Sequence, residues 1–148
     1  MDTHGVLGQI ARIREHGNAL IERELRARQD EGIVPAHGPV LACLFGQNEP
    51  VPIGVVVERV GRAKSTVTGM VNTLERHGYV RRFQSTEDQR VVYVALTASG
   101  HAIREDFEAI SEILLSDLYG SMPQTDREAL VQLLAIVEEN LRRRAENH

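Results

Sequence analysis

The segment from residue 64 to residue 76 carries the side chains best suited to contacts with another molecule. Its outward positions hold small hydroxyls, one amide and basic ends, namely Lys64, Ser65, Thr68, Asn72 and Arg76, with Thr66 beside them. Hydroxyl and amide groups hydrogen-bond to base edges in the major groove of B-DNA, and basic groups neutralise phosphates. No acidic residue lies between Lys64 and Asn72, so nothing in this stretch repels a phosphate. The pattern predicts a helix that reads double-stranded DNA.

Further basic residues lie on both sides of this segment. Arg62 precedes it, and Arg81 and Arg82 follow it, so all three are candidates for contacts with the DNA backbone. Asp88 stands two residues before Arg90, close enough for its carboxylate to hold the guanidinium in one rotamer. An arginine fixed in this way can enter a narrow, electronegative minor groove.

The distribution of charge agrees with this interpretation, although the chain as a whole is acidic. The 148 residues carry 17 basic and 21 acidic side chains, for a net charge of −4 at pH 7. Residues 59–90 have seven basic and three acidic side chains, whereas the rest of the chain has ten and eighteen. A basic island in an acidic chain is typical of a nucleic-acid site. On charge alone, however, a solvated charged face explains it equally well.

Length and composition limit the class of protein. A chain of 148 residues with 42% apolar and 26% charged side chains is typical of one globular domain. The one cysteine excludes an internal disulfide. No run approaches the ~20 apolar residues of a membrane-spanning helix, and the N-terminus lacks a signal-peptide core. We therefore expect a soluble, cytoplasmic protein with no membrane contact and no cofactor.

Apolar periodicity and capping residues predict helices and one hairpin. The expected helices cover residues 4–31, 34–45, 53–60, 64–77, 98–119 and 125–144, and the expected strands cover 79–84 and 91–96. Residues 47–51 are expected to form a loop, with Pro52 at the first position of the next helix. Thr97 is the expected N-cap of the helix at 98–119. Thr125 and Glu128 form the expected capping box of the last helix.

This order of elements predicts a winged helix-turn-helix core over residues 33–97. The fold class is mainly α with a small β-hairpin wing, and residues 1–148 are expected to form a single domain. The helices at 4–31 and 98–146 lie outside the core, and each carries an apolar stripe that must be buried against something. Packing within one chain is the simpler explanation, but two terminal helices of ~20 residues favour a partner chain.

Three motifs resemble the multiple-antibiotic-resistance regulator (MarR) family of repressors. The first is the Leu-Glu-x-x-Gly-x-Val-x-Arg stretch at 74–82, within a matching run that begins at Ala63. The others are the Asp-x-Arg of the wing at 88–90 and the Leu-Thr-x-x-Gly at 96–100. Together with one helix before the core and two after it, the resemblance covers nearly the whole chain.

The resemblance implies a homodimer that represses transcription by binding a pseudo-palindromic operator. It makes residues 64–77 the recognition helix and places Arg90 in the minor groove. It also implies that the helices at 4–31 and 98–146 form the dimer interface. A small effector, often phenolic or otherwise aromatic, would bind between the core and these helices. The effector would favour a spacing of the two recognition helices that does not fit DNA.

Three residues depart from the family pattern. Many members carry an arginine where this chain has Gly69, Gln89 replaces a common second wing arginine, and Ala63 is a weak N-cap where aspartate or serine is usual. Glycine costs about 1 kcal/mol relative to alanine in a helix interior, but it allows the helix backbone to approach DNA closely. Gly69 is therefore kept among the DNA-binding candidates.

Other residues suggest different kinds of regulator. Cys43 lies among apolar neighbours and is expected to be a buried small hydrophobe, with a redox sensor as the alternative. His37 and His101 fall on helices where some relatives bind zinc, although solvated histidines are the simpler expectation. No catalytic motif is present, so we expect no enzyme and no metal site. A winged helix that binds only proteins is the remaining alternative.

Overall fold

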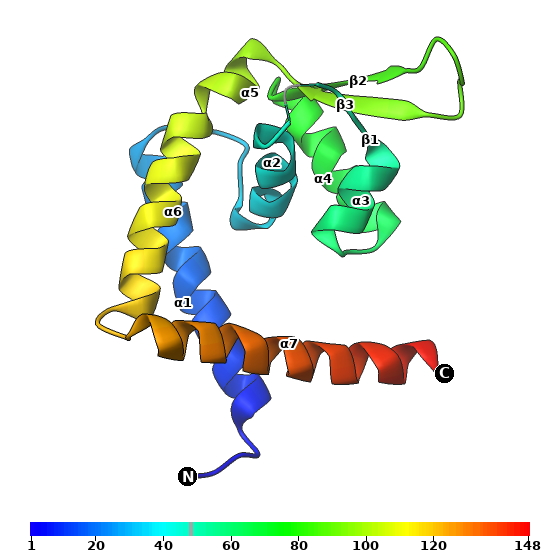
Figure 1. Cartoon of the computed structure of the whole chain (residues 1–148). Helices are drawn as coiled ribbons and strands as arrows, with labels where there is room; N and C mark the ends of the chain where they lie inside the picture. The colour runs from blue at the N-terminus through cyan, green and yellow to red at the C-terminus, as the bar shows by residue number, and fades with distance from the viewer. Residues whose placement is uncertain (48) are drawn as a thin grey trace. The chain divides into compact units, whose positions relative to one another are not determined.

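A computed structural model describes residues 1–47 and 49–148, and helices dominate it (Figure 1). The helices are α1 (Val6–Ala27), the short 3-10 helix η1 (Pro35–His37), α2 (Gly38–Phe45), α3 (Ile53–Val60), α4 (Lys64–Arg76), α5 (Ala98–Ala102), α6 (Arg104–Tyr119) and α7 (Gln124–Glu146). The strands are β1 (Val51–Pro52), β2 (Val80–Gln84) and β3 (Val92–Leu96). The predicted class, mainly α with a small hairpin wing, is confirmed.

The chain divides into two compact units, residues 1–114 and residues 115–148. The first unit contains the whole of the predicted core at 33–97, and the second contains α7. None of the described helices is long and apolar enough to cross a membrane.

The core of the first unit lies where α2, α3 and α4 meet the sheet. Its most deeply buried side chains are each at most 2% exposed, namely Val40, Leu41, Val56, Val67, Val71, Leu74, Val80 and Val94. Three of them, Val67, Val71 and Leu74, come from α4 and recur at the i, i+4, i+7 spacing of one helix face. Burying this face fixes which side of α4 is turned to solvent.

The sheet has three antiparallel strands in the order β1-β3-β2. The pair β2 and β3 form the expected hairpin, which extends away from the helices as the wing (Figure 1). Strand β1 was not expected, because residues 47–51 were predicted to be a loop with Pro52 beginning a helix. Instead, Val51 is buried opposite Val94, and Pro52 pairs with Tyr93. A two-residue strand has no alternation to detect, and proline is tolerated here because β1 is an edge strand.

The predicted helix at 98–119 was wrong in one respect, since it is broken at Ile103 into α5 and α6. Ile103 is buried against the core. Close to this break, Gly100 of α5 lies directly against the backbone of Tyr79, a residue far away in the sequence. Such a tertiary contact leaves no mark in the local periodicity.

The start of α7 also differs from the prediction. The helix begins at Gln124 with Pro123 as its N-cap and no side-chain cap, so the expected capping box of Thr125 and Glu128 does not form. Within this second unit, Arg127 holds the preceding turn instead. Its guanidinium donates to the carbonyl oxygens of Met122 (2.8 Å) and Gly120 (3.3 Å).

Candidate DNA-binding surface

Helix α4 presents the predicted polar face to solvent. Lys64, Ser65, Gly69, Asn72 and Arg76 are exposed, and Thr66 and Thr68 are half-buried. Ala63 gives the helix no side-chain cap, so the first backbone N–H groups of α4 are open to an outside acceptor such as a phosphate. Just before them, Arg62 is also exposed. The residues predicted from the sequence therefore lie together on one accessible helix and at its start.

The orientation of α4 relative to the wing is fixed by Glu75 and Arg82. One carboxylate oxygen of Glu75 accepts from the backbone N–H of Arg82 at 2.7 Å, and the other accepts from its guanidinium at 3.1 and 3.3 Å. These hydrogen bonds from Arg82 hold the pKa of Glu75 below its usual value. Because its guanidinium is engaged in this way, Arg82 positions the wing. Arg81, which is exposed, stays the candidate for a phosphate contact on this strand.

The tip of the wing is built around Asp88 and Arg90. The carboxylate of Asp88 accepts from the backbone N–H of Arg90 at 3.1 Å and from its guanidinium at 3.1 and 3.2 Å. The Arg90 side chain is 91% exposed and that of Asp88 43% exposed, so the pair faces solvent. Hydrogen bonds from Arg90 also hold the pKa of Asp88 below its usual value. The geometry agrees with the prediction that Asp88 orients Arg90.

The base of the wing is tied to α5 by Thr97, which forms the predicted N-cap. Its hydroxyl oxygen accepts from the N–H of Gly100 at 3.1 Å and donates to the carbonyl of Gly78 at 2.5 Å. The backbone N–H of Thr97 donates to the carbonyl of Tyr79 at 3.1 Å. The sequence indicated the cap but not the link to residues 78 and 79, which joins the two ends of the hairpin.

The loop between α1 and η1 lies against the C-terminal end of α4. The phenol of Tyr79 donates to the carbonyl of Glu31 at 2.8 Å. Gly32, at φ +79°, lies so close to the imidazole of His77 that a Cβ there would be 2.4 Å from the ring. A side chain at residue 32 is therefore excluded both by the positive φ and by the ring. Nothing in the local sequence indicated this contact.

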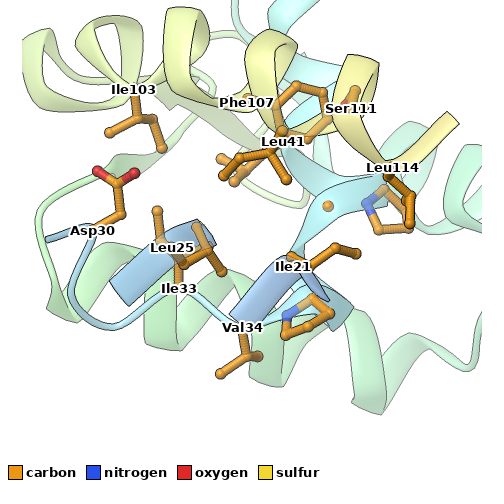
Figure 2. Close-up of a pocket in the computed structure, with 14 residues that line it drawn as sticks. Ile21, Leu25, Asp30, Ile33, Val34, Leu41, Ile103, Phe107, Ser111 and Leu114 are labelled. Atoms are coloured by element: carbon orange, nitrogen blue, oxygen red, sulfur yellow. The ribbon is translucent and has the colours of Figure 1, made fainter. Parts of the chain in front are cut away.

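The same loop lines a cavity of about 240 Å³ through Asp30, Ile33 and Val34 (Figure 2). The cavity is open to solvent on one side and is lined by α1, residues 30–35, α2 and α6, with walls that include Ile21, Leu25, Leu41, Phe107 and Ile110. Of the described residues that line it, Asp30 and Ser111 have polar side chains. Figure 2 shows the carboxyl group of Asp30 at one edge, beside Ile103.

Asp30 has an unusual environment for a carboxyl group. Partial burial, and then the neighbouring carboxyl of Asp106, raise its pKa to about 6. Arg28 opposes this effect, but its guanidinium also contacts Glu24 (2.5 Å) and Asp106 (3.7 Å). Arg28 is therefore shared among the carboxyl groups of Glu24, Asp30 and Asp106. Because of this sharing, it compensates the negative charge of ionised Asp30 only in part.

This environment predicts that Asp30→Asn stabilises the protein at neutral pH. The raised pKa means that ionising Asp30 costs more in the folded state, so the substitution should add about 1 kcal/mol after allowance for solvent screening. Well below the unfolded pKa of 3.8 the carboxyl is neutral in both states, and the gain should vanish. The gain should grow as the pH rises from 3.8 to about 6, because the unfolded state ionises first, and it should level off above pH 6. Urea unfolding at pH 4 and 7.5 measures this, with exposed Asp117→Asn as a control. A gain that does not depend on pH would contradict it.

The candidate sensor residues have three different environments. Cys43 is half-buried and packs against the hydrophobic core. His37 is buried, and its Nδ1 accepts from the N–H of Val34 at 3.1 Å; burial holds its pKa below the usual value. His101 is exposed on α5. Among residues 1–47 and 49–148, no group of three histidine, cysteine or acidic side chains is placed to bind a metal.

Known proteins share this fold and sequence. The chain is 32% identical over 107 residues to the HTH-type transcriptional regulator YcgE of Bacillus subtilis, and the match covers 69% of each chain. It is 33% identical over 92 residues to the HTH-type transcriptional regulator SarZ of Staphylococcus haemolyticus, across 62% of this chain and 61% of that one.

Among solved structures, BpsR of Bordetella bronchiseptica superposes with a TM-score of 0.77 at 22% identity, over 93% of this chain and 96% of BpsR. Its structure was described as a mechanism for regulation of DNA binding by 6-hydroxynicotinic acid.

A sequence model of the MarR family matches residues 36–92, from η1 through α4 to the tip of the wing. The family consists of transcriptional regulators rather than enzymes, which confirms the expectation that the chain is not an enzyme. The motifs, the winged fold and the relatives agree, and the chain belongs to the MarR family of transcriptional regulators.

Proposed function

We propose that this regulator is a homodimeric repressor that binds a pseudo-palindromic operator and leaves it when a small molecule binds. The observation that carries the DNA-binding part is the pairing of two exposed features. One is the polar face of α4, which carries no acidic residue between Lys64 and Asn72. The other is Arg90 on the wing, held by Asp88. A helix suits the major groove and a fixed arginine suits the minor groove.

The dimer is supported by α7, whose 23 residues include none that is buried within one chain. Its exposed apolar side chains include Val131, Leu134, Val137 and Leu141. On the helix, these four residues fall on one side, whereas Glu139 lies on the other side and pairs with both Arg142 and Arg143. Ile136 is also exposed, on the side of Glu139 and Arg143. A helix with one apolar face requires a partner surface. A second copy of this chain supplies such a face by symmetry.

Release by an effector is supported by the position of the cavity. The loop at residues 28–34 contributes Asp30, Ile33 and Val34 to the cavity wall. The same loop contacts the end of α4 through Gly32 and Glu31. A molecule that moves the loop would therefore change where the recognition helix lies. An effector needs a few kcal/mol of differential affinity to shift the population in this way.

The proposal is tested by selecting bound sequences from a pool of random duplexes. Purified protein should enrich a motif with two-fold symmetry, because each subunit contacts one half-site. If no motif is enriched and the duplexes are retained only at low salt, the chain is a non-specific DNA binder. If no duplex is retained, the winged helix serves protein contact instead.

Arg90→Ala should weaken binding to all sequences by about tenfold and make the salt dependence of log K shallower by about one unit, because one cation is lost. Fluorescence anisotropy on the selected operator at several salt concentrations measures both quantities. Gln89→Ala, at the neighbouring position of the tip, is the control and should change neither quantity. An unchanged slope for Arg90→Ala would contradict the role of the wing.

Asn72→Ala should instead alter the base preference at one position of the operator and keep the salt dependence of log K.

A further inference from the structure

The cavity between α1, α2 and α6 is lined mainly by apolar side chains. Hydrocarbon side chains from α1, α2 and α6 form most of its surface, and Phe107 supplies an aromatic ring. Of the described residues that line it, none is basic. A ligand that fills the cavity therefore buries an apolar body and meets one ionisable group, the carboxyl of Asp30.

The volume limits the size of this body. A cavity of roughly 150 Å³ lined by aliphatic and aromatic side chains accommodates benzene. At about 240 Å³, the cavity has room for one ring with a short side chain.

The groups around Asp30 decide the charge of the ligand. Asp106 faces it from α6, Glu31 and Arg28 lie on the same loop, and the phenol of Tyr79 lies nearby. Arg28 is the positive group in this set, and it already contacts Glu24 and Asp106. An anionic ligand head at this edge would meet negative charge without a free cation, whereas a cationic head would supply the missing partner.

We propose that the cavity binds a small apolar amine, whose ammonium group pairs with the carboxylate of Asp30 while its ring or chain lies among Leu25, Leu41 and Phe107. This inference rests on the proposed function, because it specifies the effector that the proposed repressor recognises. It also separates this chain from BpsR, whose named regulator is an aromatic acid.

Three probes with the same ring and different heads test the charge of the ligand. They are 2-phenylethylamine, 2-phenylethanol and phenylacetate, each titrated calorimetrically into the DNA-free protein at pH 7.5. The amine should bind at least tenfold more tightly than the alcohol, since a hydrogen bond to a charged group is stronger than one between neutral groups. Phenylacetate should bind most weakly. Equal affinities, or tighter binding of phenylacetate, would overturn the inference, and so would no binding by any probe.

The Asp30→Asn variant identifies the group that recognises the amine. It should lose at least tenfold in affinity for 2-phenylethylamine and keep its affinity for 2-phenylethanol. In the wild type, binding of the amine should weaken as the pH falls from 7.5 to 5, because Asp30 becomes protonated near pH 6. Ser111→Ala, at the other polar side chain of the wall, is the matched control and should keep the preference for the amine. An unchanged preference in Asp30→Asn would overturn the assignment.

The same titrations keep this inference distinct from the proposed function. They contain no DNA, so they report the ligand class alone. If the protein binds a symmetric operator but prefers phenylacetate, the repressor proposal stands and the amine is excluded. If the amine binds through Asp30 but no operator is selected, the cavity is correctly assigned and the proposed function fails.

Discussion

Gly100→Ala is expected to lower the free energy of unfolding by about 3 kcal/mol, the upper part of the usual range for overpacking. A Cβ at this position would be 2.1 Å from the carbonyl oxygen of Tyr79 and 3.0 Å from the side chain of Leu96. The first of these atoms belongs to the backbone at the start of the wing, so it cannot move without disturbing the link made by Thr97. Urea unfolding followed by circular dichroism measures the change.

Gly69→Ala is the matched control, because Gly69 also lies within a helix. A Cβ at Gly69 has no neighbour within 4 Å, so the substitution should raise the free energy of unfolding by about 1 kcal/mol through helix propensity alone. The two glycine-to-alanine changes are therefore expected to have opposite signs. If both stabilise the protein, the contact between Gly100 and Tyr79 is not as close as the structure places it.

Leu134→Asp should convert the proposed dimer to a monomer and reduce operator affinity by a hundredfold or more. Leu134 lies at the centre of the apolar face of α7 and is 42% exposed in a single chain. A carboxylate there would have to be desolvated in the interface, which costs several kcal/mol. Without the dimer, each half-site is bound separately, and the gain of ~10²–10⁴ that comes from linking two sites is lost. Sedimentation velocity and anisotropy measure the two effects.

Gln132→Asp adds the same charge to the opposite side of α7 and is the control for Leu134→Asp. Gln132 is exposed and lies near the ion pairs of the polar face. We expect it to leave both the dimer and the operator affinity unchanged. If Leu134→Asp also remains a dimer with full affinity, α7 does not form the interface, and the exposed apolar residues of α1, including Leu7 and Ile13, become the candidates.

The parts of the site that the sequence predicted correctly are those that local spacing determines. The polar face of α4 follows from the helical repeat that buries Val67, Val71 and Leu74. The pairing of Asp88 with Arg90 follows from their separation by one residue in a tight turn. In both cases the residues that determine the geometry lie within a few positions of one another.

The parts that the sequence did not indicate depend on residues distant in the chain. Asp30 and Asp106 come from different elements, so the acidic edge of the cavity could not be inferred from either segment. The same holds for Gly100 against Tyr79 and for β1 against β3. The engagement of Arg82 by Glu75 spans seven residues and a change from helix to strand, which no single periodicity describes.

The hydrogen bonds between Asp88 and Arg90 have a consequence for how the wing would bind DNA. A free arginine side chain samples many rotamers, and immobilising it costs up to about 2 kcal/mol of conformational entropy. The hydrogen bonds from Asp88 favour one arrangement of this side chain before any operator is present, so part of that cost is met during folding. In the proposed complex the guanidinium would reach a narrow minor groove from this arrangement and would have to give up its bonds to Asp88 to follow a wider one. The wing would therefore respond to minor-groove width and add sequence discrimination at base pairs that it never contacts.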